Sequence, residues 1–440
     1  MVEPVDVGRR LADPDLYEEV ILRIFEKRNR RGQAFAEASE GITYFDTATM
    51  RRGFARAVAR TVSAGDYRPQ AVQLWHLESK GKVRAAHMAS FSDHVVGSAL
   101  YRLLSINARC YGLPGVYSYL PGTSNVVAMR SLATYVRAHR TGRRPQPLFV
   151  LQSDFDHYGD RLPVGPDAPL WPIVREVAAL GSPNGEISTC TWNLITELAR
   201  PVVHDTDADF VRLHGVAMGT PLVPLLSNLA VAPMDRAVLG IDGIFYARFN
   251  DDFILAHPEL EAIREADTLI DSLTTQLGVR RKTVKEIRTV LSGNGMASPD
   301  APGYRGGNRI DCLGLSVSHA GTLTVGPHRL RRFIVRICDR IRAAAGALNQ
   351  LPEQERARHI VAATNVMLDT ASPFAIVGLP ALLDTTTDRG VLKDLDFRIM
   401  RAIVQAATGR PGIRGLRVLP PHRLYGEFGL TSLVNLRNAH

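Results

Sequence analysis

Two adjacent carboxylates, Asp251 and Asp252, stand between two short apolar runs, and this pattern constrains the fold more than any other part of the chain. The runs, 243–249 and 253–256, are rich in aromatic or aliphatic residues, as half-buried strands are. Asn250 and Asp251 favour a tight turn, so we predict a β-hairpin with both carboxylates at its tip. Like charges at one tip repel, and a bound divalent cation is one reason to hold them there. A solvated Asp-Asp turn is the alternative.

Composition and charge indicate a globular protein with an acidic partner. The chain has 440 residues, of which 45% are hydrophobic and 22% charged, and its formal net charge is +9. Its four cysteines are scattered and there is no His-Glu-x-x-His, which argues against a zinc site or a disulfide framework. The N-terminus does not resemble a signal peptide, and no apolar run approaches the ~18 residues of a membrane span. We therefore expect a cytoplasmic protein without a membrane partner.

The order of the predicted elements favours an α+β fold over a doubly wound sheet, because strands and helices mix without regular alternation. Strands are expected at 71–77, 83–88, 147–154, 243–249, 253–256, 286–291, 310–317 and 322–325. Helices are expected over 92–105, with a cap at Ser92-Asp93, over 167–180, 187–200, 222–239 and 258–277, through most of 1–70, and after residue 325.

Asp154 ends the strand expected at 147–154 and is the natural third carboxylate for the hairpin pair. Phosphoryl transfer with two divalent metals requires oxygen ligands that bridge both ions. An ordinary strand-terminating Asp is the alternative. We interpret the neighbouring Asp156 and Asp160 as solvated or as supports of the site rather than as ligands.

A glycine-containing turn lies between these acids in the sequence. Gly215, Gly219 and Pro221 lead directly into an apolar helical segment. Glycine lets the backbone approach a base pair or a sugar closely, because it lacks the side chain that would block it. Many such loops merely start helices, so the position of this one between Asp154 and the hairpin is what gives it weight.

Several blocks in register resemble the prokaryotic reverse transcriptases over roughly residues 70–325. Tyr246 to Leu255 is similar to the family's Tyr-x-Arg-Tyr-Ala-Asp-Asp-Phe-x-Leu hairpin. Gly215 to Asn228 resembles its Gly-x-Pro-Gln-Gly-Ser-Pro-Leu-Ser-Pro-Leu-Leu-Ser-Asn block. The other similar blocks are 80–84 with 92–100, 117–124, 154–158, 277–285 and 312–316.

The resemblance implies a right-hand polymerase with fingers, an antiparallel-sheet palm and a helical thumb. Its domains would be an N-terminal helical extension at 1–70, fingers and palm at 71–325, and a thumb or C-terminal region at 326–440. Two Mg²⁺ ions, or Mn²⁺, would be held by Asp154, Asp251 and Asp252, which would be the catalytic residues of RNA-directed DNA synthesis.

Other residues would bind substrates. Lys82 and Arg84 follow a glycine turn and can meet a triphosphate, although a solvated hairpin is the alternative. Lys285 would protonate or orient the leaving pyrophosphate, but other basic residues surround it in the sequence. The resemblance adds Phe155, Tyr158, Gly159, Met218 and Gly219 to the substrate site, and Leu313 and Gly314 as the primer grip.

One departure from the family bears on the product. The position five after Asp154 usually carries a bulky aromatic residue that excludes a ribose 2′-hydroxyl, and here it is Gly159, preceded by Tyr158. Either Tyr158 takes over this role or discrimination against ribonucleotides is relaxed. The usual Gln of the glycine turn is Met218.

The helix expected after residue 325 combines two stripes. A basic stripe of this kind can follow a nucleic-acid backbone, and a solvated charged face is the alternative. The apolar stripe comprises Leu330, Phe333, Ile334, Ile337 and Ile341, and the basic stripe comprises Arg329, Arg332, Arg336 and Arg340.

The size of the chain resembles that of retron and phage-defence (abortive-infection type) reverse transcriptases. This resemblance implies an antiviral role with a structured non-coding RNA, an RNA template, a DNA product and nucleoside triphosphates as partners, and a homo-oligomer or partner protein as further options. Two alternatives stay open. One is a template-restricted or template-independent nucleotidyl polymerase that makes homopolymers or short repeats, and the other is an RNA-binding scaffold with a retained palm.

Overall fold

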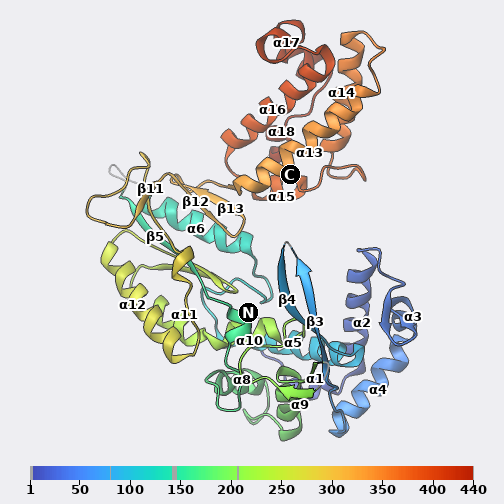
Figure 1. Ribbon diagram of the computed structural model, residues 1–440, viewed down its shortest axis with the longest axis vertical. Helices are drawn as coiled ribbons and strands as arrows, with labels where there is room; N and C mark the ends of the chain where they lie inside the picture. The colour runs from blue at the N-terminus through green and yellow to red at the C-terminus, as the bar shows by residue number, and fades with distance from the viewer. Residues whose placement is uncertain (1–2, 80, 141–145, 206–207, 440) are drawn as a thin grey trace. The chain divides into compact units, whose positions relative to one another are not determined.

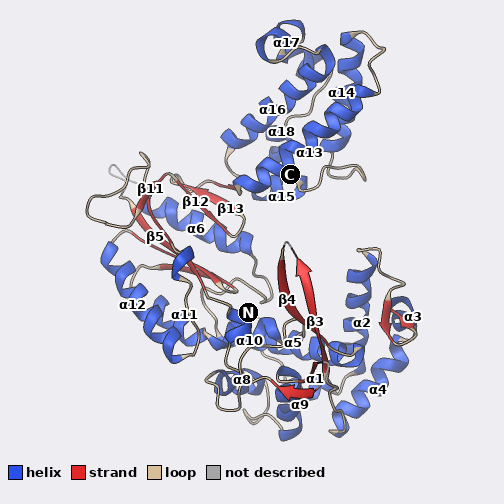
Figure 2. Cartoon of the chain, viewed as in Figure 1, coloured by secondary structure: helices blue, strands red, loops and turns tan. Residues whose placement is uncertain are grey.

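The computed structural model describes residues 3–79, 81–140, 146–205 and 208–439 and divides into two compact units (Figure 1). Unit 1 comprises Met1–Ala128 and Val150–Ile287, and unit 2 comprises Met129–Phe149 and Arg288–His440. Both units mix helices with strands (Figure 2), so the chain is α+β, as expected. The domain borders expected near residues 70 and 325 stay predictions. In the described part of the chain, no helix has the length and apolarity that a bilayer crossing requires.

Unit 1 begins with short helices whose ends are set by side-chain caps. Asp6 and Asp13 accept hydrogen bonds from the first turns of α1 and α2, and Thr43 and Asp46 form a reciprocal capping box at α3. The elements are α1 (Val7–Leu11), α2 (Pro14–Asn29), β1 (Glu37–Ser39), β2 (Ile42–Thr43), α3 (Tyr44–Thr49) and α4 (Arg51–Ala64). The helical character expected for 1–70 is confirmed, and the β1–β2 hairpin is an addition to it.

A four-stranded sheet of order β4-β3-β6-β7 follows in unit 1. Its two longer strands, β3 (Val72–Ser79) and β4 (Lys82–Met88), were predicted and pair in antiparallel fashion. Its two short strands, β6 (Val202–Asp205) and β7 (Ala208–Val211), were not predicted, because four residues give too little periodicity to recognise.

Unit 1 contains further helical elements between residues 91 and 285. Ser90, rather than Ser92-Asp93, caps α5, and its hydroxyl accepts a hydrogen bond from the Asp93 amide. The helix expected over 222–239 breaks at Val231, because Pro233 has no amide hydrogen with which to continue it. The helices are α5 (Phe91–Tyr111), α7 (Tyr158–Arg161), α8 (Leu170–Ala179), α9 (Thr189–Ala199), α10 (Val223–Ala230), α11 (Ala232–Leu239), α12 (Leu260–Gln276) and the 3₁₀ turn η1 (Thr283–Lys285).

The expected Asp-Asp hairpin is confirmed. Strands β8 (Phe245–Phe249) and β9 (Asp252–His257) are antiparallel, with Phe249 opposite Asp252. Strand β9 lies between β8 and β5 (Leu148–Asp154), whose first four residues are buried. The carboxylates at the ends of β5 and β9 therefore come from neighbouring strands.

Unit 2 combines short strands with a helical part (Figure 2). The single strand expected at 310–317 is two strands, because Leu313 and Gly314 both adopt positive φ, 52° and 74°, and form a tight turn between them. The strands are β10 (Ile287–Leu291), β11 (Arg305–Gly307), β12 (Arg309–Cys312), β13 (Leu315–Ser318) and β14 (Leu323–Val325).

The helical part of unit 2 is built around α13, α14 and α16, which pack against one another. Phe333, Ile337 and Ile341 are buried on α13, as the sequence pattern predicts, whereas Leu330 and Ile334 of the same predicted stripe are only half-buried. The helices are α6 (Asn125–Arg140, mostly in this unit), α13 (Pro327–Gly346), α14 (Glu353–Leu368), α15 (Leu379–Thr385), α16 (Arg389–Thr408), α17 (Gly412–Val418), the π-helical turn η2 (Arg423–Glu427) and α18 (Leu433–Ala439).

Candidate functional site

The three candidate ligands meet where β5 ends and β9 begins. Asp154 is the last residue of β5, Asp252 is the first of β9, and Asp251 lies in the turn that precedes it. The amide of Phe155 donates to the carbonyl oxygen of Asp251 over 3.1 Å, which ties the turn to the end of β5. Lys285 Nζ lies 3.3 Å from Asp154 Oδ2. One side of unit 1 thus holds three carboxylates and one ammonium group.

The electrostatics of this cluster fit a divalent cation. Although Asp252 as a residue is exposed, partial burial of its carboxylate and the negative charges of Asp251 and Asp154 raise its pKa to about 6, against the opposing charge of Lys285. Asp154 Oδ1 is buried and has no hydrogen-bond partner among the described residues, which is costly for a charged oxygen. A divalent cation would neutralise the repulsion and satisfy that oxygen, and carboxylates are the ligands Mg²⁺ prefers.

The three carboxylates do not form a closed metal-binding cluster in this structure. Among the described residues, no three His, Cys, Asp or Glu side chains are gathered closely enough to hold one metal ion.

The segment before α6 lines the outer edge of β8 and holds the turn from that side. The Arg248 amide donates to the Gly115 carbonyl over 2.7 Å, and the Tyr117 amide donates to the Arg248 carbonyl over 2.8 Å. The Asn250 amide donates to Ser118 Oγ over 2.8 Å. The sequence placed Tyr117–Ser124 among the similar blocks without a role for it, and its role here is to support the turn.

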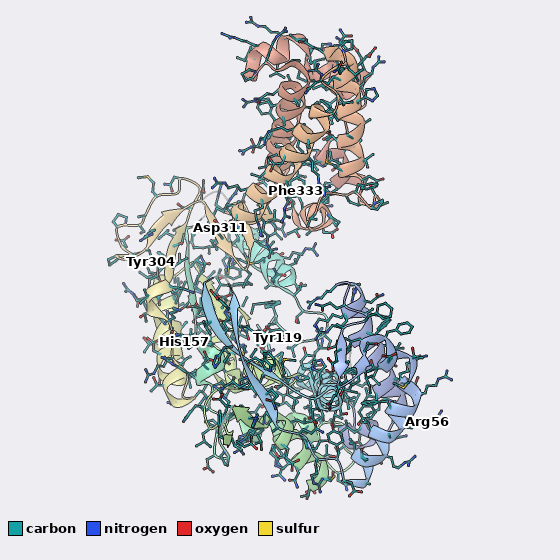
Figure 3. All side chains as sticks on the ribbon, turned by 45° about the vertical axis from the view of Figure 1, so that its right-hand side comes forward. Arg56, Tyr119, His157, Tyr304, Asp311 and Phe333 are labelled. Atoms are coloured by element: carbon teal, nitrogen blue, oxygen red, sulfur yellow. The ribbon has the colours of Figure 1, made fainter. Side chains whose placement is uncertain are left out.

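Tyr119 is a residue near the site that sequence reasoning missed (Figure 3). Its ring lies against Phe249, with centroids 6.3 Å apart, and its side chain is partly exposed. Burial and the charge of Asp251 both raise its pKa. It adopts a left-handed backbone conformation with φ 58°, which is strained for a tyrosine, and strained residues of this kind are enriched at functional sites.

A buried arginine beneath the turn was also missed. Arg248 and Asp235 form an ion pair of 2.6 Å in which both side chains are fully buried. Strand alternation places Tyr246 and Arg248 on one face, so an arginine between apolar residues is a signal for a buried pair. Its partner on α11 could not be predicted, because the sequence does not show which acid the strand packs against.

Phe155 and Tyr158 lie below the carboxylates. Both are buried, at 2% and 5% exposure, and their rings lie 4.9 Å apart. The Tyr158 hydroxyl donates to the Ser227 carbonyl. His157, which lies between them in the sequence, is exposed, and its ring lies near the carboxylates of Asp156 and Asp160.

Gly159 and Met218 are in close contact. A Cβ at Gly159 would lie 2.6 Å from the Met218 sulfur, and the Met218 side chain is 39% exposed. The next residue, Gly219, has φ 110°, and a Cβ there would lie 2.7 Å from the His87 carbonyl oxygen. The glycines of this turn therefore allow its close approach to α7 and to β4.

The basic residues of the predicted substrate site differ in their surroundings. Arg84 is exposed on β4 opposite Leu77, and the side chain of Lys82 lies outside the described part of the structure. Lys285 has a side chain that is 63% exposed and faces Asp154. Arg281, in the same run, is buried and pairs with Asp267 and Glu286. The structure therefore distinguishes Lys285 from Arg281, whose charge is already paired.

The predicted nucleic-acid residues lie in unit 2. Gly314 is covered by Arg329, because a Cβ there would lie 2.8 Å from the Arg329 guanidinium carbon. The Gly326 amide donates to the Gly314 carbonyl over 2.9 Å, which fixes this turn to the start of α13. All four arginines of the basic stripe are exposed on α13, beside the buried face that carries Phe333.

Comparisons with known proteins return distant structural similarities. No family model and no curated protein matches this chain. Telomerase from Candida albicans, solved in complex with a fragment of telomeric RNA, is 12% identical with a TM-score of 0.49, over 81% of this chain and 65% of that one. Apo telomerase from Candida tropicalis is 10% identical with a TM-score of 0.46, over 82% of this chain and 68% of that one.

A form of the Candida tropicalis enzyme truncated from its C-terminal domain is 12% identical with a TM-score of 0.45, over 58% of this chain and 55% of that one. This chain thus spans less than two thirds of the first and the truncated telomerase chains. Similarity at this level assigns neither a family nor an activity to this chain.

Proposed function

We propose that this protein is a nucleotidyl polymerase that adds deoxynucleotides under the direction of an RNA template. The observation that carries the proposal is the meeting of Asp154, Asp251 and Asp252, where one carboxylate oxygen is buried without a partner and one carboxyl has its pKa raised to about 6. Carboxylates gathered in this way suit metal-assisted phosphoryl transfer. The sequence blocks that resemble those of reverse transcriptases are the basis for proposing an RNA template and a DNA product.

In this proposal Asp154, Asp251 and Asp252 would hold two Mg²⁺ ions, or Mn²⁺. When bound, the ions would activate the attacking oxygen and stabilise the leaving one. The 3′-hydroxyl would lose its proton to solvent water, and its oxygen would form a bond to the α-phosphorus of a nucleoside triphosphate. The bond from that phosphorus to the bridging oxygen of pyrophosphate would break. Lys285 would give a proton to the departing pyrophosphate or orient it.

The proposed polymerase reaction also assigns residues to substrate binding. Arg84 would bind the triphosphate through its planar guanidinium, with Lys82 as a point charge beside it. Phe155 and Tyr158 would form the floor below the nucleotide, and Gly219 would let the backbone approach it. The strands β3 and β4 would belong to the fingers, β5, β8 and β9 to the palm, and α13 to α16 to the thumb, with domain borders near residues 70 and 325.

In unit 2, Leu313 and Gly314 would act as the primer grip. The exposed stripe of Arg329, Arg332, Arg336 and Arg340 would follow a phosphate backbone. The excess of basic residues supports an RNA partner, which we take to be a structured non-coding RNA in antiviral defence, with a second copy of the chain or another protein as a further partner.

One alternative is favoured by a specific contact. Because the Tyr158 ring is buried and its hydroxyl is engaged, the exposed side chain over Gly159 is that of Met218. A flexible thioether in place of a fixed ring fits an enzyme with relaxed sugar or template selection, such as a template-restricted or template-independent polymerase.

The decisive experiment supplies each deoxy- and ribonucleotide singly and in mixtures, with Mg²⁺, with and without co-purified RNA. Incorporation of deoxynucleotides that requires RNA supports the main proposal, and sequencing of the product identifies the template. Incorporation of a single nucleotide without RNA supports the alternative. If the Asp251→Ala/Asp252→Ala double variant retains phage protection, the protein acts as an RNA-binding scaffold and the catalytic proposal is wrong.

A further inference from the structure

We infer that Arg248, held by Asp235, is a positioning residue that fixes the Asn250-Asp251 turn in the geometry needed to bind metal. This inference rests on the proposed function, because it concerns the same carboxylates. Arg248 does not reach the reacting groups, and it acts through the peptide groups on which Asp251 is carried.

Every N–H of the Arg248 guanidinium has an acceptor. Nε and Nη2 donate to the two carboxylate oxygens of Asp235 over 2.8 and 2.6 Å, in the bidentate geometry that matches a carboxylate. Nη1 donates to Asn228 Oδ1 over 3.2 Å and to the Asn250 carbonyl over 3.0 Å, and Nη2 also donates to the Asn228 carbonyl over 3.1 Å. An arginine has five such donors, so none is left unused.

The network reaches both sides of the Asn250 residue. Its carbonyl oxygen accepts from Arg248, and its amide donates to Ser118 Oγ over 2.8 Å. Ser118 is itself fixed by Asn228, whose Nδ2 donates to the Ser118 carbonyl over 2.7 Å. The peptide groups before and after Asn250 are therefore held by one connected set of fully buried groups.

Asn250 links the buried Arg248 network to the Asp251 carboxylate. Its backbone adopts φ 61°, a conformation that asparagine tolerates but that other side chains disfavour. Its Nδ2 donates to Asp251 Oδ1 over 2.9 Å, and the Asp251 carbonyl accepts from the Phe155 amide. The position of the Asp251 carboxylate thus follows from the buried pair below it.

Stability alone does not account for this pair. Taking both charges out of water costs more than a buried pair typically returns, and apolar residues of similar volume often stabilise a fold equally well. The Tyr246 hydroxyl adds a donor to Asp235, and burial followed by the charge of Asp235 raises the pKa of this tyrosine, which keeps it neutral. Because each of the five donors of the Arg248 guanidinium has a fixed direction and an acceptor, the network constrains the local backbone, and that backbone is the Asn250-Asp251 turn.

The test compares Arg248→Lys and Ser118→Ala with the matched control Arg356→Lys in the full-length protein. Lysine keeps the charge of Arg248 but cannot form the fork, and Ser118→Ala removes the acceptor of the Asn250 amide together with the hydroxyl's own hydrogen bond to Asn228 Oδ1. Arg356 likewise binds backbone carbonyls, those of Asn349, Leu351 and Ala407, but in the helical part of unit 2. The readouts are the Kd for Mn²⁺ from electron paramagnetic resonance, kcat and KM for nucleotide incorporation, and Tm.

We expect Arg248→Lys to weaken Mn²⁺ binding at least fivefold and to lower kcat at least tenfold, with the nucleotide KM changed less than twofold. Ser118→Ala should shift the Mn²⁺ Kd and kcat in the same direction by about half as much on a logarithmic scale. Arg356→Lys should lower Tm while its Mn²⁺ Kd, kcat and KM stay within twofold of wild type.

The outcomes separate the two proposals. If Arg248→Lys folds and matches wild type in Mn²⁺ Kd and kcat, the positioning role is wrong, whereas the polymerase stands if wild type incorporates nucleotides. If wild type incorporates none but Arg248→Lys still weakens Mn²⁺ binding, the polymerase is wrong and the positioning role stands. If Arg248→Lys does not fold, Ser118→Ala decides, and wild-type values in that variant overturn the inference. Wild-type protein that binds no Mn²⁺ also overturns it.

Discussion

The Met218 sulfur lies over Gly159, 2.6 Å from the point where a side chain at that position would begin. Gly159 is held there by the Val216 amide, which donates to its carbonyl over 2.8 Å, and Met218 by the His87 amide, which donates to its carbonyl over 2.7 Å. The backbones of both residues are therefore held in place. A side chain added at position 159 would compete with the Met218 side chain for the same volume.

This competition predicts a coupled effect on stability. Gly159→Ala should lower the free energy of unfolding by about 1 kcal/mol at most, because the added methyl group must displace Met218, whose flexible and partly exposed side chain can move aside. Met218→Ala in the same chain should recover part of that loss. Chemical denaturation of the two single variants and the double variant measures the coupling. The control is Gly53→Ala in α4, where a Cβ meets nothing within 4 Å, and it should stabilise the fold by about 0.5–1 kcal/mol. Additive effects at residues 159 and 218 would contradict the contact.

The same contact predicts a change in sugar selection. If Met218 is the side chain that meets the sugar, Met218→Ala opens space, and the ratio of kcat/KM for ribonucleotides to that for deoxynucleotides should rise about tenfold. Single-nucleotide kinetics with matched deoxy and ribo substrates measure this ratio. Met296→Ala, which removes an exposed methionine of unit 2, should leave the ratio unchanged. An unchanged ratio in Met218→Ala would exclude this residue from sugar selection.

Lys285 offers a test of the acid role. Lys285→Ala removes the ammonium group that lies 3.3 Å from Asp154 Oδ2, and kcat should fall by about 10²-fold if that group donates a proton in the reaction. Pre-steady-state incorporation isolates the chemical step. Lys393→Ala, at an exposed position of α16, is the control and should keep kcat within twofold. Wild-type incorporation by Lys285→Ala would assign the proton transfer to another group.

The C-terminal helix α18 depends on one buried acid. Asp396 of α16 accepts hydrogen bonds from Ser432 Oγ and from the Leu433 amide, each over 2.7 Å. Asp396→Ala should lower the free energy of unfolding by about 1–2 kcal/mol, because the first turn of α18 loses its cap. Asp394→Ala, which breaks an exposed pair with Arg398, should cost about 0.5 kcal/mol or less. Equal losses in the two variants, measured by denaturation, would show that α18 does not rely on this cap.

The sequence predicts the hairpin and the strand that carry the three acids, because a run such as 245–249 joins apolar periodicity to turn residues at its end. It does not predict the partners of Arg248, since the pairing of a strand residue with Asp235 on a helix depends on packing between distant segments. It also does not reveal that Met218 fills the space above Gly159, because a glycine shows only that a side chain is absent. Local sequence patterns therefore predict the three acidic residues, whereas tertiary packing determines which residues surround them.

The short strands β6 and β7 were not predicted for a related reason. Strands β6 and β7 have four residues each, and β6 is held by parallel pairing with β3, which lies more than a hundred residues earlier. Non-local pairing of this kind leaves little mark on composition or periodicity.

Incorporation of labelled deoxynucleotides by the wild-type protein and by Asp251→Ala/Asp252→Ala, with RNA and Mg²⁺, tests the central claim most directly. Asp160→Asn, at an exposed acid of α7 outside the ligand set, is the matched control. We predict RNA-dependent incorporation by wild type and by Asp160→Asn, loss of at least 10³-fold in the double variant, and loss in wild type when a chelator removes the metal. Incorporation that persists in the double variant, or none by wild type under any of these conditions, would contradict the account.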